Sequence, residues 1–196
     1  VLAGARNRRT HAQARVMAAE IANARLTFIE GAGHMLHVDA PDAFPTIWSY
    51  GHRNPQGLSL DPETGRLWST EHGPRGGDEL NRVERKENYG WPRVTHGMNY
   101  NGTPITDRTS MPGMKDPVVH WTPSLAVCGL AFYDGNVFTG WKGSLLAGSL
   151  AAQELRLLRL DGEEVVEQRI LISDAGRIRD VIVGPDGFPY VVFNRP

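Results

Sequence analysis

Two hydrophobic patterns follow one another along the chain and meet near residue 45. Between residues 10 and 24, apolar side chains recur at the spacing of one helical face: Ala14, Met17, Ala18, Ile21 and Ala22. Thr10 stands where an N-cap belongs, so the pattern predicts a helix over 10–24. The short apolar run 26–29, followed by Gly31 and Gly33, predicts a strand that ends in a turn.

After Pro45 the pattern changes to short alternating runs typical of strands. The predicted strands are 46–50, 57–60, 67–71, 79–83, 130–133, 144–148, 155–160, 165–172, 178–183 and 190–193. Turn sequences separate several of them: DPETG, YDG, LDG and GPDG. Strands this close together, with no helices between them, indicate an all-β fold.

An imperfect repeat runs through the all-β part. The segments 57–70, 129–150 and 180–193 each give a strand, an acidic turn and a second strand. Units recurring every ~40–50 residues are typical of propeller blades. A sandwich built from unrelated hairpins is the alternative that the repeat alone leaves open.

Composition restricts the function classes. Of 196 residues, 40% are hydrophobic, and 21 Lys and Arg balance 22 Asp and Glu, which argues against nucleic acid or an anionic membrane as a partner. Cys128 is the single cysteine, so an internal disulfide and a multi-cysteine zinc site are excluded. No membrane-spanning stretch and no signal peptide are present in the sequence as given, which predicts a cytoplasmic location if nothing was removed.

Several motifs then occur in a recognisable order, among them GHRNPQG (51–57), EHGPRGGDE (71–79), GLAFY (129–133) and GRIRD (176–180). With these motifs, nearly everything from Ile47 to Phe193 resembles the soluble PQQ-dependent aldose and glucose dehydrogenases, although the related family is often periplasmic or secreted. The resemblance implies a six-bladed β-propeller. It also implies that pyrroloquinoline quinone (PQQ) and calcium bind in a cleft at one end of the central tunnel.

The resemblance assigns roles residue by residue. It implies that Arg53 and Asn54 contact the quinone, that Arg177 and Arg179 hold the cofactor carboxylates, and that Trp121 forms a wall of the sugar site. Guanidinium groups suit a tricarboxylate, because they can hold a carboxylate with two hydrogen bonds.

The same comparison implies a calcium site. Gly73 and Pro74 match residues whose backbone carbonyls bind the cofactor calcium, and Asp78, followed by Glu79, matches an acidic residue near it. Calcium prefers such oxygen ligands. Taken singly, each of these residues could also be an ordinary surface or turn residue.

The sequence departs from the family in two ways. A lysine expected at the cofactor falls at or beside Ala151, and the family chain is about twice as long, with the histidine base in the half that is missing here. Loss of a positioned base costs ~10²–10⁴-fold in rate. His72 and His52 are the nearby candidates to replace it, and we assign the catalytic roles to His72 and Asp78.

Residues 1–44 resemble a different family, the C-terminal tail of an α/β-hydrolase, in which a strand, a helix and a strand lead into a GAGH turn. His34 matches the catalytic histidine of that family. However, Asn7 stands where a triad acid often lies, and no G-x-S-x-G motif occurs in the chain. A histidine without its partners is not a triad, so residues 1–44 read as an appendage fused to a propeller half at 45–196.

Half a propeller, about three blades, leaves two open ends. We therefore expect a homodimer in which two copies close a six-bladed ring. Segment 46–50, with 25–29 as a further candidate, is expected to complete the final blade, from the partner or within the same chain.

Three functions stay open. The first is a PQQ-dependent sugar dehydrogenase with residual or altered activity on a small-molecule substrate. The second is a metal-dependent hydrolase of phosphotriesters, lactones or aryl esters, by analogy with paraoxonases and diisopropyl fluorophosphatase, with a tunnel calcium as Lewis acid beside Asp78, Glu79 and His72. The third is a non-catalytic fusion product.

Overall fold

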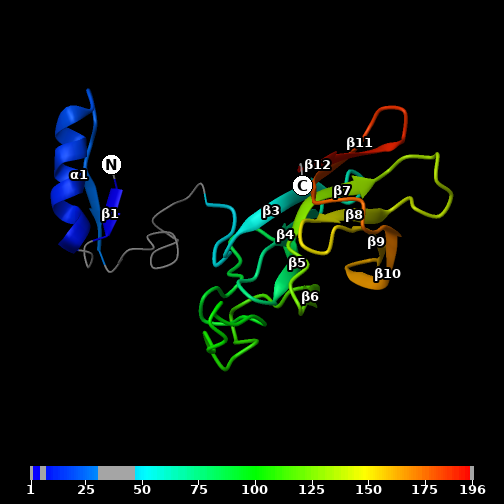
Figure 1. Cartoon of the computed structure of the whole chain (residues 1–196). Coiled ribbons are helices and arrows are strands. Elements are labelled where there is room, and N and C mark those ends of the chain that lie inside the picture. The colour runs from blue at the N-terminus through cyan, green and yellow to red at the C-terminus, as the bar shows by residue number, and fades with distance from the viewer. Residues whose placement is uncertain (1, 5–7, 31–46, 195–196) are drawn as a thin grey trace. The chain divides into compact units, whose positions relative to one another are not determined.

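The computed structural model describes residues 2–4, 8–30 and 47–194. The chain divides into two compact units, Val1–Tyr50 and Gly51–Pro196 (Figure 1). No helix among the described residues is long and apolar enough to cross a membrane. His34, Asn7 and the predicted fusion point near residue 44 lie outside the described residues.

The first unit is a strand, a helix and a strand: β1 (Leu2–Gly4), α1 (Arg8–Glu20) and β2 (Thr27–Ile29). The two strands pair in parallel, as expected of strands joined by a helical crossover. On the helix, His11 and Arg15 lie against the ring of Phe28, with a centroid separation of 4.6 Å for the two rings. Segment 27–29 therefore belongs to this small sheet.

The bounds of the helix differ from those predicted. The helix begins at Arg8, so Thr10 is inside its first turn and the predicted N-cap is wrong. It ends at Glu20, four residues before the predicted end. Asn23 adopts a left-handed conformation (φ 61°), so a right-handed helix cannot continue through it. The apolar spacing at Ile21 and Ala22 does not reveal this change of backbone conformation.

The second unit consists of three antiparallel sheets, each made from consecutive strands. The first contains β3 (Pro55–Leu60), β4 (Leu67–Glu71), β5 (Asp78–Val83) and β6 (Val119–Trp121). The second contains β7 (Val127–Tyr133), β8 (Ser144–Ser149), β9 (Leu155–Asp161) and β10 (Glu164–Ile172). The third is the hairpin of β11 (Ile178–Val183) and β12 (Pro189–Phe193). The all-β prediction is confirmed, with two four-stranded blades and a two-stranded sheet.

Most predicted strands form within a few residues of their expected bounds. Two predictions differ: residues 47–49 form no strand, with only a bridge at Tyr50, and the short strand β6 was not expected. The third sheet contains two strands among the described residues, and β2 pairs with β1 in the first unit. The completion of the final blade by segment 46–50 or 25–29 stays a prediction.

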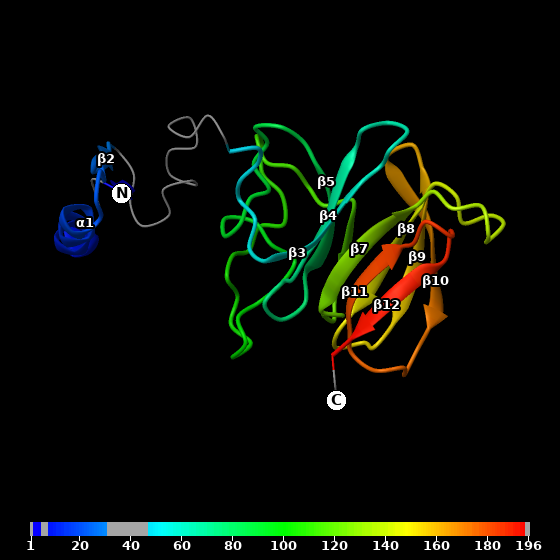
Figure 2. The same cartoon turned by 90° about the horizontal axis from the view of Figure 1, so that it is seen from above.

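Packing between the sheets places their first strands next to one another. β7 contacts both β3 and β11 (Figure 2). One core lies between the first two sheets and includes Trp68, Leu80, Leu130, Leu145 and Leu158. The other lies between the second and third sheets and includes Tyr133, Leu146, Leu157, Ile178 and Val181.

Several hydrogen bonds join β7 to the first sheet. The Thr70 hydroxyl donates to the Cys128 carbonyl at 2.5 Å, and the Phe132 amide donates to the Ser59 hydroxyl at 2.8 Å. The approach requires glycine at position 57, because a Cβ there would lie 2.4 Å from the Cys128 oxygen.

Both ends of this row of sheets expose apolar side chains. On β3, Gly57 and Ser59 face the second sheet, so Leu58 and Leu60 project from the opposite face and are 64% and 56% exposed. At the other end, Tyr190 and Val192 of β12 are 51% and 53% exposed. These two surfaces, here called the β3 face and the β12 face, are what an incomplete propeller is expected to leave uncovered.

Candidate functional site

Arg53, just before β3, reaches the turn between β4 and β5. Its Nη1 donates to the carbonyl oxygens of His72 (2.9 Å) and Gly73 (3.1 Å). The guanidinium lies 5.4 Å from the ring centroid of Trp91, and Nη2 is 3.4 Å from the hydroxyl of Tyr100. Trp91 and Tyr100 were not predicted as site residues, although the YGWP stretch could have suggested the first.

Asn54 and His72 also meet at this turn. The His72 amide donates to the Asn54 carbonyl at 3.1 Å, which extends the pairing of β3 and β4 by one step. His72 Nε2 is buried and has no hydrogen-bond partner among the described residues. Arg53, Asn54, His72 and Gly73 are thus brought together as the sequence predicts, beside a narrow cavity that Arg53, His72 and Gly73 help to line.

The sequence predicts Asp78 as a metal ligand and a catalytic group, but in the structure both of its carboxylate oxygens accept hydrogen bonds from other protein groups. Its side chain is fully buried, and Oδ1 accepts hydrogen bonds from the Gly73 amide (3.0 Å) and the Ser124 hydroxyl (2.6 Å). Oδ2 accepts from the Val127 amide at 3.2 Å. These three donors tie the β4–β5 turn to the start of β7, so the contacts favour a structural role.

Glu79 forms a buried pair with Glu71 across the β4–β5 ladder. The Asn81 amide bridges them, 3.1 Å from Glu79 and 3.4 Å from Glu71. Burial, and then the negative charge of Glu71, raises the pKa of Glu79 to about 8. Burial opposes ionisation of Glu71 as well, but hydrogen bonds from His52, Glu79 and the Arg53 amide outweigh it and lower its pKa. Without a bound cation, Glu79 therefore holds a proton at neutral pH, and a calcium ion that bound there would have to displace this proton.

Arg179, on β11, meets side chains from the first strands of the other two sheets. Its Nη1 lies 3.5 Å from both Gln56 Oε1 on β3 and Cys128 Sγ on β7. Gln56 Nε2 in turn donates to Asn54 Oδ1 at 2.9 Å. Arg177 has an exposed side chain. Gln56 was missed as a site residue, although its place in GHRNPQG beside Asn54 could have found it.

Trp121 lies in the core between the first two sheets rather than on an open surface. It is 7% exposed, and its indole nitrogen donates to Gln168 at 2.9 Å. The role as a wall of a sugar site stays a prediction, and the burial favours a packing role in the chain as described.

The predicted calcium ligands fit the ion unequally. The carbonyl oxygen of Gly73 is a suitable donor, and Pro74 follows it in the same turn. The oxygens of Asp78 are engaged by protein donors, and Glu79 holds a proton at neutral pH. In the described part of the chain, no group of three or more His, Cys, Asp or Glu side chains is arranged to hold a metal ion.

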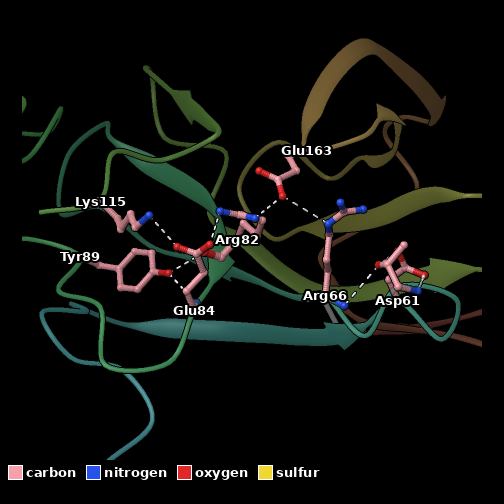
Figure 3. A network of polar contacts seen from close by, with 8 residues as sticks. Asp61, Arg66, Arg82, Glu84, Tyr89, Lys115 and Glu163 are labelled. Carbon is pink, nitrogen blue, oxygen red and sulfur yellow. Dashed lines mark hydrogen bonds and ion pairs between the residues drawn. The ribbon is translucent and has the colours of Figure 1, made fainter.

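A second, wider cleft of about 500 Å³ lies between the first two sheets and is lined mainly by charged residues. Figure 3 shows how these charges pair. Glu163 contacts both Arg82 and Arg66, and Glu84 contacts Arg82 and Lys115, the last at 2.6 Å. Glu163 of the second sheet thus pairs with two arginines from the first sheet, and these ion pairs favour a structural role for the cleft.

Comparison with known proteins agrees with the fold and with the motifs of the site. Residues 29–196 match the model of the glucose/sorbosone dehydrogenase family. The chain belongs to this family. The matched residues begin at 29, inside the segment 1–44 that resembles a hydrolase tail.

Individual relatives match about three quarters of the chain. The aldose sugar dehydrogenase YliI of Escherichia coli (strain K12) is 44% identical over 149 residues, which are 74% of this chain and 40% of that protein. A crystal structure of a glucose dehydrogenase is 49% identical with a TM-score of 0.72, over 75% of this chain and 43% of the other. The PQQ-bound aldose sugar dehydrogenase of Streptomyces coelicolor is 30% identical with a TM-score of 0.58, over 76% of this chain and 40% of the other. The chain spans about two fifths of the length of the curated relatives it matches.

Proposed function

We propose that this chain carries the cofactor-binding part of a PQQ-dependent aldose dehydrogenase. The observation that carries the proposal is a connection between two cationic groups from different blades. Arg53 precedes Asn54, Asn54 accepts from Gln56, and Gln56 lies 3.5 Å from Arg179. Two guanidinium groups, one just before the first strand of the first sheet and one on the first strand of the third sheet, suit an anion with several carboxylates.

When bound, PQQ supplies the two-electron acceptor for oxidation of an alcohol. The residues of this chain would hold its carboxylates through Arg179 and Arg177 and its quinone end through Arg53 and Asn54. His72 Nε2 is buried and has no hydrogen-bond partner among the described residues, so in this proposal it would accept the proton of a sugar hydroxyl. His72 is our candidate for the base that the family supplies from its other half.

Binding of PQQ tests this proposal directly. We expect added PQQ to quench the tryptophan fluorescence of the purified chain and, with calcium, to support aldose-dependent dye reduction. Arg179→Met should weaken PQQ binding by about tenfold or more, since a charged hydrogen bond to a carboxylate is lost. Arg159→Met is the matched control, because Arg159 pairs with Glu167 on the second sheet. Absence of PQQ binding would refute the proposal, and binding without dye reduction would separate cofactor binding from catalysis.

Calcium is part of the proposal through the carbonyl groups of Gly73 and Pro74. The hydrolase alternative needs a calcium supported by Asp78 and Glu79, and the hydrogen bonds on Asp78 and the proton on Glu79 weigh against it. Ester or phosphotriester hydrolysis that depends on metal but not on PQQ would favour it nonetheless. A chain that binds neither PQQ nor calcium would be the non-catalytic fusion product.

Two further proposals concern the assembly. We propose that two copies close a six-bladed ring through the β3 face and the β12 face, since both faces are apolar and exposed. We also propose that residues 1–44 derive from an α/β-hydrolase, which the parallel pairing of β1 and β2 around α1 supports.

A further inference from the structure

The turn that carries the predicted calcium ligand already contacts a cation. Arg53 Nη1 donates to the carbonyl oxygens of His72 and Gly73 at 2.9 and 3.1 Å. The calcium role of Gly73 would use this same carbonyl oxygen. Among the ion pairs between described residues, none includes the Arg53 guanidinium, so the two carbonyl dipoles are its main electrostatic partners.

The surroundings of Arg53 hold it in this position. Its guanidinium lies over Trp91, and the hydroxyl of Tyr100 is 3.4 Å from Nη2. The Arg53 amide donates to Glu71 at 3.0 Å, which fixes the backbone from which the side chain extends.

We propose that the Arg53 guanidinium occupies the cation position of the His72–Gly73 turn and must leave it when a divalent cation binds there. Calcium binds carbonyl oxygens at about 2.3–2.6 Å, so a calcium on the Gly73 oxygen would lie about 4–5 Å from Nη1. Like charges at that separation repel strongly where water is scarce. The inference rests on the calcium part of the proposed function and adds to it that Arg53 competes with the cation.

Competition has a consequence for the anionic ligand. A guanidinium released from the two carbonyls is free to bind a carboxylate or quinone oxygen of the cofactor. Cation and polycarboxylate therefore bind with positive coupling, and the coupling passes through Arg53.

The test is a calorimetric titration of the chain with calcium chloride, without PQQ. Arg53→Met should bind calcium about tenfold more tightly than the unchanged chain, and Arg53→Gln should change the affinity in the same direction. Arg75→Met is the matched control: it removes an equal charge from the same turn, but its guanidinium lies near Gly102 and not at the two carbonyls. Thermal melts of all four proteins check that each is folded.

Salt separates direct occupancy from a distant charge effect. A gain in affinity that persists at high salt and is absent from Arg75→Met supports the proposal, since screening acts mainly on exposed charges. Equal gains in Arg53→Met and Arg75→Met, or a weaker affinity in Arg53→Met, would overturn it. Because the titration contains no PQQ, failure of the unchanged chain to bind PQQ would refute the proposed function without altering this result.

Repeating the titration with PQQ present tests the coupling. PQQ should raise the calcium affinity of the unchanged chain and have a clearly smaller effect on Arg53→Met. An equal effect in both proteins would show that Arg53 does not carry the coupling.

Discussion

At the scale of single residues, the hydrogen bonds of Asp78 favour a structural role for this acidic residue of the binding motif. It is fully buried, and its two oxygens accept from Gly73, Ser124 and Val127. Asp78→Ala leaves three donors unsatisfied, so we expect a loss of roughly 3–5 kcal/mol in the free energy of unfolding. Urea unfolding with and without a chelator measures this, with the exposed Asp134→Ala as control. A loss that appears only when calcium is present would contradict the structural role and restore Asp78 as a metal ligand.

Glu79 gives a prediction about pH. Its folded pKa of about 8 lies above the ordinary 4.5, so the folded chain holds more protons than the unfolded chain between these values. The contribution of Glu79 to stability is therefore complete below about pH 4.5 and is lost as pH rises through 8. Glu71 behaves oppositely, because its lowered pKa affects stability only in acid.

Glu79→Gln imitates the protonated side chain and removes this titration. We expect the variant to match the unchanged chain near pH 5 and to be more stable at pH 9, by on the order of a few kcal/mol. Thermal melts across this range measure the difference. A constant difference between the two proteins at every pH would show that Glu79 does not titrate in this window.

At the scale of elements, contacts that reach the first strand of the next blade hold neighbouring blades together. Thr70 is fully buried and donates to the Cys128 carbonyl on β7. Thr70→Val keeps the shape but leaves that carbonyl unsatisfied, so we expect unfolding to become easier by roughly 1–3 kcal/mol. Thr70→Ser retains the hydroxyl and is the control, with only the smaller cost of a lost methyl group. Equal losses for both variants in urea would show that packing, and not the hydrogen bond, matters at this position.

Strands were predictable where local pattern alone decides them. β4 and β11 have the predicted bounds, because their apolar runs are limited by turn residues on both sides. The strand β6 was not predictable, since three residues gain strand geometry only by pairing with Asp78, Glu79 and Leu80. The helix ends at Glu20, three residues before the left-handed Asn23, and the apolar spacing does not encode this end.

The candidate site also contains residues whose placement follows from local sequence and residues whose placement depends on distant parts of the chain. Arg53, Asn54, His72 and Gly73 lie together in the structure, because the first two come just before β3 and the last two just after its partner β4. The state of Asp78 and the position of Gln56 beside Arg179 depend on partners 46–123 residues away in the chain. Sequence alone names such residues but cannot say which of their hydrogen-bonding groups are already occupied.

At the scale of the whole molecule, the two exposed apolar faces predict which surfaces meet in the dimer. A mass measurement alone would show that a dimer forms but not which faces form it. If two copies close a ring head to tail, each interface joins the β3 face of one copy to the β12 face of the other. Leu58→Asp damages the first face, and Val192→Asp damages the second. Each interface of the ring contains one β3 face and one β12 face, so a dimer of either variant has one buried charge in each of its two interfaces. Light scattering after size exclusion should therefore find monomers of each variant alone.

Mixing the two variants distinguishes this arrangement from one in which like faces meet. In a mixed ring, one interface contains both substitutions and the other contains none, so an equimolar mixture should recover dimers through the intact interface. A dimer in which the β3 face meets the β3 face, or the β12 face meets the β12 face, could not be rescued in this way, because every mixed pair would bring one charged face against its unchanged counterpart. Recovery of dimers only in the mixture would support the head-to-tail ring. Two monomeric variants whose mixture stays monomeric would exclude it, as would an unchanged chain that is itself a monomer of 21.6 kDa.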